Sequence, residues 1–271
     1  MIKFPNGKIN LGLNIVGKRD DGFHNIETIF YPIALNDALE IIPANDGKFR
    51  FDHTGLPIPG HEPDNLCVKA FQLLKADFGL PGVKMHLHKT IPMGSGLGGG
   101  SSDGAFTLKM LNDLFMLGMD HDQLREYASR LGSDCAFFIE NQTVFAIKKG
   151  DQFTNLTVDL SGLFIVIVIP DVPVATADAY RWVLPEIPSR PLTDLVQLPI
   201  TEWKDQVVND FEKPVFTRFP VIGKIRNKLY ESGAVYASMS GSGSAVYGIF
   251  EGMPYLNEQF PNCFVWASPL F

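Results

Sequence analysis

The segment PMGSGLGGGSSDGA, residues 92–105, decides how this chain folds. Residues 83–88 before it alternate apolar and polar side chains, which predicts a one-sided strand. The apolar periodicity after it predicts a helix from Ser101 or Ser102, as the N-cap residue, to about Leu117. Glycines let a backbone approach an anion closely, and the first N–H groups of a helix face that anion. The segment therefore predicts a phosphate-binding loop between a strand and a helix.

Other phosphate-binding signatures fit this chain poorly. Gly94, Gly96 and Gly99 satisfy the spacing of a dinucleotide fingerprint, but the strand before them is polar on one face. A Walker A loop is excluded, because no Gly-Lys pair in the chain is followed by Ser or Thr. The DFG at 77–79 precedes the glycine loop, and the chain contains no HRD, which disfavours a protein kinase.

Composition narrows the class of protein further. The 271 residues carry 23 Lys and Arg against 30 Asp and Glu, and this net charge of −7 disfavours nucleic acid and anionic membranes as partners. Cys67, Cys135 and Cys263 lie far apart, as in reduced intracellular proteins. The first residues lack the apolar run of a signal peptide, and the apolar run 163–169 is too short to span a bilayer. We therefore expect a soluble cytoplasmic protein.

The remaining pattern mixes strands and helices without strict alternation, which predicts an α+β fold. We expect two domains, 1–150 and 151–271, and a surface loop in the proline-rich stretch 185–200. Strands are expected at 8–16 (half-buried), 26–35, 38–42, 143–148 and 163–169 (central and covered on both faces), and again around the SGSGS turn and in CFVWAS. Helices are expected at 65–78, 122–131, 174–183, 202–211 and 219–231.

Three motifs occur in a characteristic order. The first is PNGKINL at 5–11 with DGFH at 21–24, the second is the glycine loop, and the third is SMSGSGSAVYGIF at 238–250. This order resembles the GHMP small-molecule kinases. The fuller combination, with NDFE at 209–212 and the Asn-Leu pair at 65–66, is similar to the 4-diphosphocytidyl-2-C-methyl-D-erythritol kinases of non-mevalonate isoprenoid biosynthesis.

The resemblance implies a two-domain α+β fold, with a left-handed βαβ unit in an ATP-binding N-terminal domain and a ferredoxin-like C-terminal domain on the substrate side. It implies ATP and Mg²⁺ as cofactors, and phosphorylation of the 2-hydroxyl of 4-(cytidine 5′-diphospho)-2-C-methyl-D-erythritol. Two alternatives stay open. The first is another GHMP kinase, and the Phe23–His24 pair is the feature that distinguishes this chain from it. The second is a non-catalytic nucleotide-binding regulator. The implied assembly is a monomer or a homodimer.

The resemblance implies that Lys8 and Asp134 form the catalytic pair. A tertiary alcohol is a poor nucleophile, and a carboxylate that orients it and accepts its proton is worth roughly 10² to 10⁴ in rate. A lysine can keep that carboxylate ionised and offset charge on the reacting oxygens. Taken without the motif, the spacing around Lys8 favours a solvated strand lysine, and Asp134 fits a helix N-cap after Gly132 as well as it fits a catalytic carboxylate.

The other expected contacts also follow from the resemblance. The residues expected to bind the nucleotide are Asn65, Lys89, Pro92, Gly94, Gly96, Leu97, Gly98, Gly99, Gly100, Ser101, Ser102 and Asp103. The Ser102 hydroxyl is the expected metal contact. The residues expected to bind the substrate are Asn10, Phe23, His24, Thr176, Tyr180, Gly241, Ser242 and Gly243. His24 is expected to read the cytosine edge, and Phe23, which replaces the family's usual Tyr, to stack on the base.

Some residues depart from the family pattern or suggest other chemistry. Asp103 stands where the family often has Asn, and its carboxylate either weakens ATP binding or contacts ATP through Mg²⁺. Cys135 lacks a recognisable His partner, so we expect a buried packing residue. His86 and His88 share one strand face without an evident third ligand, which favours an exposed face over a metal site.

Overall fold

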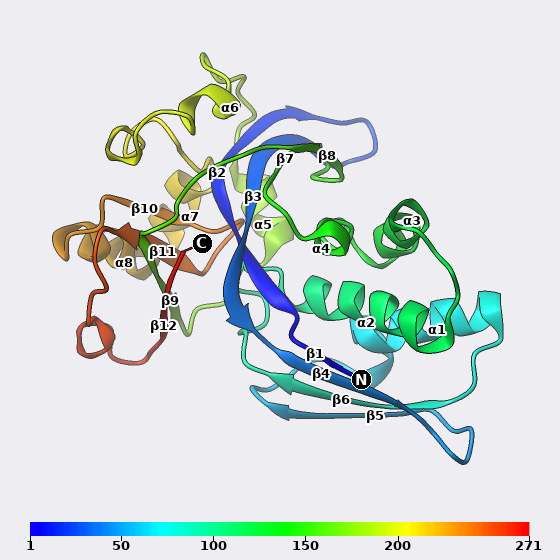
Figure 1. The fold of residues 1–271 in the computed structure, drawn as a ribbon. Coiled ribbons are helices and arrows are strands. Elements are labelled where there is room, and N and C mark those ends of the chain that lie inside the picture. The colour runs from blue at the N-terminus through cyan, green and yellow to red at the C-terminus, as the bar shows by residue number, and fades with distance from the viewer. Residues whose placement is uncertain (271) are drawn as a thin grey trace. The chain divides into compact units, whose positions relative to one another are not determined.

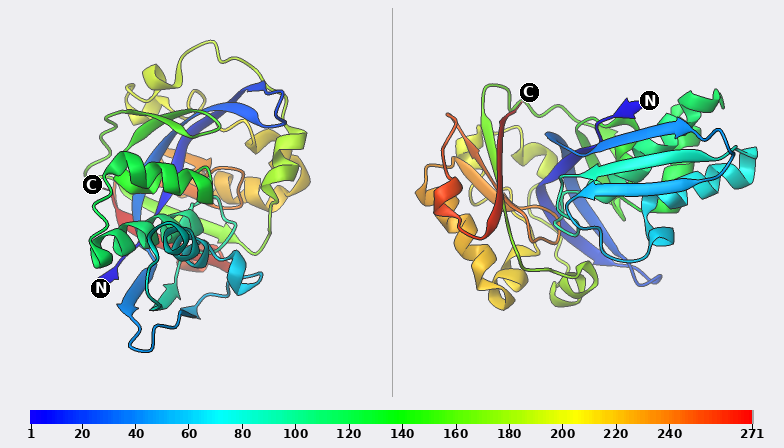
Figure 2. Two further views of the ribbon diagram at one scale, coloured as in Figure 1. Left: turned by 90° about the vertical axis from the view of Figure 1, so that its right-hand side faces the viewer. Right: turned by 90° about the horizontal axis from the view of Figure 1, so that it is seen from below.

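The computed structural model describes residues 1–270; Phe271 lies outside the described part. The chain divides into two compact units, each of which contains both helices and strands (Figures 1 and 2). Unit 1 comprises Met1–Gly7, Leu35–Met93 and Gly98–Gln142. Unit 2 comprises Lys8–Ala34, Gly94–Leu97 and Thr143–Phe271. The α+β class is confirmed, and the domain boundary near residue 150 remains a prediction.

Unit 1 is a four-stranded sheet with helices on one face (Figure 1). Its strands are, in spatial order, β1 (Ile2–Lys3), β4 (Ala38–Pro43), β6 (Val83–Lys89) and β5 (Arg50–Gly55). Its helices are α1 (Leu66–Phe78), α2 (Gly99–Phe115), α3 (His121–Leu131) and α4 (Phe137–Glu140). β5 and β6 are parallel and are joined through α1, which makes a βαβ unit. The glycine loop leaves this sheet at the end of β6.

Apolar spacing explains why these elements form. β6 buries Val83, Met85 and Leu87 and turns the residues between them outward, as the alternation predicts. α1 and α2 pack against each other, and α2 also packs on α3, α4 and β4. α3 begins with a capping box of Asp120 and Gln123, which satisfies two N–H groups that lack helical partners.

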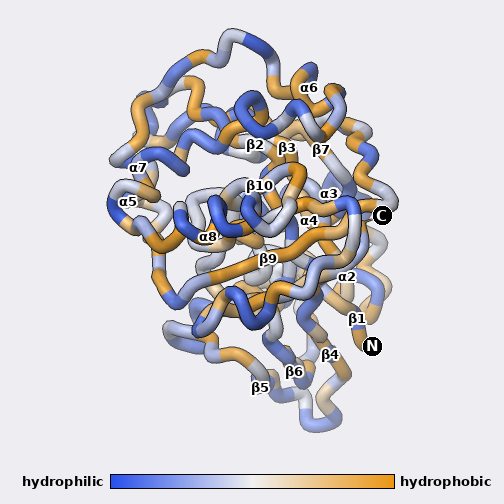
Figure 3. Tube along the Cα trace, turned by 90° about the vertical axis from the view of Figure 1, so that its left-hand side faces the viewer, coloured by the Kyte–Doolittle hydropathy of each residue, from blue (hydrophilic) through white to orange (hydrophobic). Residues whose placement is uncertain are grey.

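Unit 2 contains a second sheet, with strand order β10 (Tyr236–Met239), β11 (Val246–Phe250), β9 (Phe164–Pro170) and β12 (Cys263–Pro269). All neighbouring strands within this sheet are antiparallel. Numbered along the chain and read from β12, the order is 4-1-3-2, that of a ferredoxin-like sheet. β9 is apolar along its length and buried from Ile165 to Ile169, as predicted for a central strand (Figure 3).

Helices complete the core of this unit. They are α5 (Thr176–Trp182), α6 (Leu192–Leu195), α7 (Glu212–Arg218) and α8 (Pro220–Glu231). α8 packs on β9, β10 and β11, and its Ile222, Ile225 and Leu229 enter the core. Among residues 1–270, no helix has the length and apolarity needed to cross a membrane.

A third sheet has the strand order β2 (Asn6–Lys18), β3 (His24–Asn36), β7 (Val144–Lys148) and β8 (Gln152–Asn155). The prediction that β2 is half-buried is wrong, because every residue from Asn6 to Ile15 is buried, the polar ones included. Hydrogen bonds compensate this burial: Tyr247 Oη, for example, donates to the Asn10 carbonyl at 2.7 Å.

Two expectations in the second half are also wrong. Residues 202–211 form no α-helix; the 3₁₀ turn Ile200–Glu202 is followed by turns, and α7 starts at Glu212. Trp203, Val207 and Phe211 have helical spacing, yet they reach the interior from turns. The stretch 185–200 is not only a surface loop, since α6 lies in it and buries its two leucines.

Candidate active site

The glycine loop passes directly into α2. The N-cap of α2 is Gly98, at a φ of 70°, and the helix begins at Gly99. The expectation that Ser101 or Ser102 caps this helix is therefore wrong: the cap has the left-handed conformation that glycine adopts without steric cost. The first N–H groups of α2, which have no partners within the helix, and its positive dipole end form a site suited to an anion.

Ser102 supplies a second sign that this helix end binds a ligand. Its hydroxyl is buried and has no hydrogen-bond partner among residues 1–270. A buried polar atom without a partner costs free energy unless a ligand or water satisfies it. An orphaned hydroxyl in the first turn of α2 fits a phosphate group or a phosphate-bound cation.

Lys89, at the end of β6, is the centre of a buried charged triad with Asp37 and Asp103. Lys89 Nζ donates to Asp103 Oδ2 at 2.7 Å and also to Asp37 Oδ2, and all three side chains are buried. Asp37 Oδ1 accepts the backbone N–H groups of Thr90 and Ile91 at 2.5 and 2.8 Å. The triad thus fixes the chain where it enters the glycine loop. Asp37 was missed at the sequence level because it belongs to no recognisable motif.

The triad holds two carboxyl groups and one ammonium, and burial has the largest effect on the protonation of Asp103. Burial raises the pKa of Asp103 to about 7, with Lys89 lowering it and Asp37 raising it. Burial opposes the charge of Lys89, but Asp103 and Asp37 outweigh this and raise the pKa of the ammonium. Below about pH 7 Asp103 therefore carries a proton.

This protonation predicts how stability depends on pH. The pKa of an unfolded Asp is about 3.9, so between that pH and 7 the folded chain holds one proton more than the unfolded chain. The stabilisation from protonated Asp103 is complete below about pH 4 and is lost as pH rises through 7. Asn cannot ionise, so Asp103→Asn should not lose this stabilisation. As pH rises from about 4 to 7, its free energy of unfolding should therefore increase relative to that of the wild type by up to about 1.4 kcal/mol per pH unit.

Denaturant unfolding of both proteins at pH 5, 6, 7 and 8 measures this difference. Asp113→Asn, at an exposed position of the same helix, is the matched control and should follow the wild-type curve. Parallel curves for the wild type and Asp103→Asn would contradict the protonated triad.

A cavity of about 190 Å³ lies beside the triad in unit 1. Its lining residues are Phe51, His53, Ile58, Pro59, Gly60, His61, Glu62, Asp64, Asn65, Leu66, Met93, Gly100 and Asp103. The structure thus brings together three residues that were expected to contact the nucleotide: Asn65, Gly100 and Asp103. Asn65 also caps α1, since its Oδ1 accepts the Cys67 N–H at 2.8 Å. The lining histidines were missed because their segment carries no motif.

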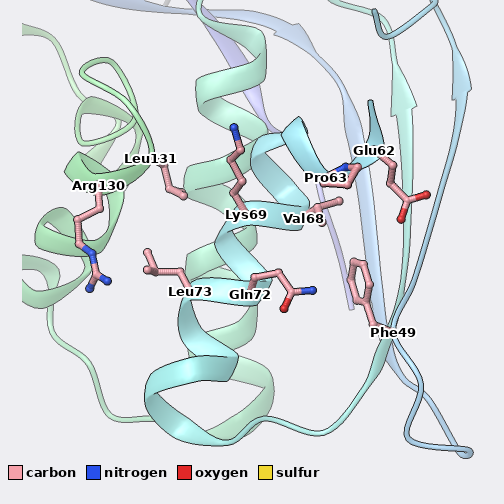
Figure 4. A pocket seen from close by; sticks show the side chains of 9 residues that line it. All are labelled: Phe49, Glu62, Pro63, Val68, Lys69, Gln72, Leu73, Arg130 and Leu131. Atoms are coloured by element: carbon pink, nitrogen blue, oxygen red, sulfur yellow. The ribbon is translucent and has the colours of Figure 1, made fainter. Parts of the chain in front are cut away.

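A second groove, of about 620 Å³, lies along the outer side of α1 and contains no expected site residue (Figure 4). Its floor is apolar, with Phe49, Val68 and Leu73 among its residues. Its cations are already paired, Lys69 with Asp64 and Arg130 with Asp77.

In unit 2 the first motif is held in a buried hydrogen-bond network. Lys8 is 3% exposed, so the solvated-lysine alternative is contradicted. Its Nζ donates to Asn10 Oδ1 at 2.6 Å and lies 4.9 Å above the Phe30 ring. Asn10 Nδ2 donates to Thr28 Oγ1 at 2.8 Å, and Thr28 Oγ1 donates to the Gly12 carbonyl at 2.6 Å. The Lys8 ammonium is therefore held in one orientation.

Ser240 joins all three motifs. Its hydroxyl contacts the Gly96 carbonyl at 3.0 Å and Asn10 Oδ1 at 3.4 Å. A Cβ on Gly96 would lie 2.1 Å from the Ser240 carbonyl oxygen, so only glycine fits there. The Lys8 N–H donates to the Leu97 carbonyl at 2.8 Å. Sequence reasoning missed Ser240, whose role depends on contacts with residues more than 140 positions away.

The residues expected to bind the substrate form two pairs in unit 2. The His24 ring stacks on Tyr180, with centroids 5.0 Å apart and planes at 21°. Thr176 Oγ1 lies 3.0 Å from Ser242 Oγ. Phe23 is 59% exposed, and Lys149 Nζ lies 5.2 Å above its ring.

The protonation state of His24 suits recognition of a base. Burial lowers its pKa, and the positive charge of Lys18 lowers it further. At neutral pH the ring is therefore uncharged, with one nitrogen as a donor and the other as an acceptor.

Asp134 lies in unit 1, in the turn between α3 and α4, and is half-buried. It does not cap the following helix, because the N-cap residue of α4 is Ala136, so the N-cap alternative is wrong. Its neighbour Cys135 is fully buried, and burial raises the pKa of its thiol to about 12, as expected of a packing residue. Unit 1 thus contains Asp134 and the residues expected for the nucleoside, while unit 2 contains Lys8 and those expected for the substrate.

His86 and His88 lie on the outer face of β6, as predicted for an exposed strand face. Thr54 Oγ1 lies 3.1 Å from His86 Nε2 and 3.0 Å from His88 Nδ1.

Comparisons with known proteins identify the family of this chain. The family models described as GHMP kinases N terminal domain and GHMP kinases C terminal match residues 65–142 and 195–254. The chain is 49% identical to a 4-diphosphocytidyl-2-C-methyl-D-erythritol kinase from Parabacteroides distasonis, over 100% of both chains. It is 53% identical to the kinase of that name from Bacteroides thetaiotaomicron, over 93% of this chain and 92% of the relative.

Solved structures give the same result. A crystal structure of 4-(cytidine 5′-diphospho)-2C-methyl-D-erythritol kinase matches with a TM-score of 0.84 and 31% identity, over 98% of both chains. A homoserine kinase from Cytophaga hutchinsonii matches with a TM-score of 0.66 at 17% identity, over 98% of this chain and 94% of the other, and so shares the fold alone. The predicted fold is confirmed, and the chain belongs to the 4-diphosphocytidyl-2-C-methyl-D-erythritol kinase family of the GHMP kinases.

Proposed function

We propose that the protein transfers the γ-phosphate of ATP to the 2-hydroxyl of 4-(cytidine 5′-diphospho)-2-C-methyl-D-erythritol, with Lys8 and Asp134 as its catalytic residues. As a GHMP kinase it is a small-molecule kinase that uses ATP. The observation that carries the assignment is the buried network in which Lys8, Asn10, Ser240 and Gly96 connect the three motifs.

Asp134 acts on the acceptor alcohol. Its carboxylate orients the tertiary hydroxyl and accepts its proton as the oxygen attacks phosphorus. Lys8, whose Nζ donates to Asn10, offsets the negative charge that develops on the transferring phosphoryl oxygens. Phosphoryl transfer otherwise depends on positioning, which the buried network of Lys8 supplies.

The phosphates of ATP bind at the glycine loop and the first turn of α2. Backbone N–H groups supply most of the contacts there, so little positive charge is needed. Mg²⁺ neutralises phosphate charge when it is bound, and the orphaned Ser102 hydroxyl is the residue we assign to its site. The nucleoside binds at the cavity lined by Asn65, Gly100 and Asp103. Lys89 contributes as the buried centre of the triad beside that cavity.

The cytidine moiety binds at Phe23, His24 and Tyr180. Neutral His24 pairs with the hydrogen-bonding edge of cytosine, and the exposed Phe23 ring offers a face for stacking. Thr176 and Ser242, together with Gly241 and Gly243, bind the methylerythritol side of the substrate.

For the chain as a whole we propose a cytoplasmic location, a boundary near residue 150 between its two domains, and a monomeric or homodimeric state.

A comparison of acceptors tests this proposal. The purified protein with ATP and Mg²⁺ should release ADP with 4-(cytidine 5′-diphospho)-2-C-methyl-D-erythritol, at a kcat/KM at least about 10³ above that for mevalonate or homoserine, because those acceptors lack a base to engage His24. Faster turnover of mevalonate or homoserine would assign the chain to another GHMP activity. ATP binding without turnover of any acceptor would favour a nucleotide-binding regulator.

A further inference from the structure

Asn209 lies where the chain turns into α7, outside the residues assigned to substrate or nucleotide. It is 3% exposed. Its Nδ2 donates to the Met239 carbonyl at 2.8 Å and to the Gly241 carbonyl at 2.9 Å, while its Oδ1 accepts the Phe211 N–H at 3.0 Å. Both amide protons and the amide oxygen are thus bonded to backbone, which fixes the side chain and the segment it touches.

Glu212, in the first turn of α7, holds the same segment from its other side. Its Oε1 accepts the Met239 N–H at 2.8 Å and the Ser238 hydroxyl at 2.9 Å. Its Oε2 accepts from Arg226 Nη1 at 2.5 Å, which orients the carboxylate. Met239 is therefore bonded through its N–H by Glu212 and through its carbonyl by Asn209.

The segment held in this way leads directly to the Lys8 network. Ser240 follows Met239, and its hydroxyl contacts Asn10 Oδ1 and the Gly96 carbonyl. Asn10 Oδ1 in turn accepts from Lys8 Nζ. A shift of the backbone at Met239 and Ser240 would move the partner that orients Asn10 and Lys8. Gly241, whose φ of 56° sets the turn after Ser240, is held by the same Asn209 side chain.

We propose that Asn209 and Glu212 are positioning residues for phosphoryl transfer: they clamp residues 238–241 and so set Ser240, Asn10 and Lys8 in their working arrangement. This inference rests on the proposed function, because it gives Lys8 a catalytic role. It predicts that loss of the clamp lowers kcat more than it raises the KM for ATP, since small displacements of reacting groups cost rate strongly.

Asn209→Ala tests the clamp by removing both donors. We expect kcat with the cytidyl substrate to fall by about 10- to 100-fold, with the KM for ATP within about two-fold of wild type. Asn112→Ala is the matched control, because Asn112 makes the same kind of bridge elsewhere: its Nδ2 donates to the Met119 carbonyl at 3.1 Å and its Oδ1 accepts the Met119 N–H at 3.0 Å. Both variants should lower Tm, but only Asn209→Ala should lower kcat.

A double-mutant cycle with Ser240→Ala separates positioning from general destabilisation. If Asn209 acts through Ser240, the double variant should lose little more activity than the worse single variant. Should Asn209→Ala fail to fold, Glu212→Gln replaces it in the cycle, since it keeps the shape and removes the charge that binds Arg226.

Three results decide the matter. Fully multiplicative losses in the cycle, or equal kcat losses for Asn209→Ala and Asn112→Ala, would overturn the positioning role. A wild-type kcat retained in folded Asn209→Ala would overturn it too. Failure of the wild type itself to phosphorylate the cytidyl substrate would count against the proposed function, so the two failures are distinguishable.

Discussion

Replacing Asp134 with asparagine is expected to lower kcat by about two to four orders of magnitude, which is the usual contribution of a general base. Asparagine has nearly the same shape but cannot accept a proton from the acceptor hydroxyl. Asp134 is a half-buried turn residue and asparagine has nearly its size, so the variant should keep a Tm near that of the wild type. ATP should still bind, because we assign the phosphate contacts to the glycine loop and α2.

Steady-state kinetics with the cytidyl substrate and calorimetric titration with ATP measure both parts of this prediction. Asp113→Asn, an exposed carboxylate of α2, is the control and should keep full activity. A kcat within about three-fold of wild type in Asp134→Asn would show that another group takes the proton.

The second large effect is expected at Lys8. Lys8→Met keeps an unbranched side chain of similar length but removes the charge and the hydrogen bond to Asn10. Loss of a single donor that stabilises transition-state charge typically costs 10²- to 10³-fold in kcat, and we expect a loss of about that size. Because the residue is buried above the Phe30 ring, the apolar replacement should be accepted without unfolding.

Circular dichroism establishes the fold of Lys8→Met, and initial rates at saturating ATP establish kcat. Lys84→Met, at an exposed position of β6, serves as the comparison and should be neutral. If both variants retained wild-type kcat, Lys8 would have only a structural role in its network.

Much of the fold could be predicted because its signals are local. The alternation in β6 and the helical spacing in α1 each place one apolar face within a single short segment. Segments without a clean period were predicted less well. β5 was not foreseen, because five of its six positions are exposed and its one large apolar side chain, Phe51, is only half-buried. The prediction of a helix at 202–211 is wrong because buried side chains that come from successive turns have the same sequence spacing as one face of a helix.

The site divides in the same way. Lys8, His24 and the glycine loop lie in motifs and could be named from the sequence. Asp37, Ser240 and the clamp role of Asn209 depend on partners 30 to 230 positions away, which no local pattern encodes. The burial of Lys8 was missed for the same reason: the residues that contact it, such as Phe30 and Leu97, are remote in sequence.

The most direct test of the proposed reaction is ³¹P NMR of the product formed from ATP and 4-(cytidine 5′-diphospho)-2-C-methyl-D-erythritol. The 2-hydroxyl is tertiary, so a phosphate placed on it has no proton on the attached carbon. The account predicts ADP and a new phosphomonoester resonance without three-bond coupling to protons, with the diphosphate signals retained. A proton-coupled phosphomonoester, or no new phosphate ester at all, would contradict it.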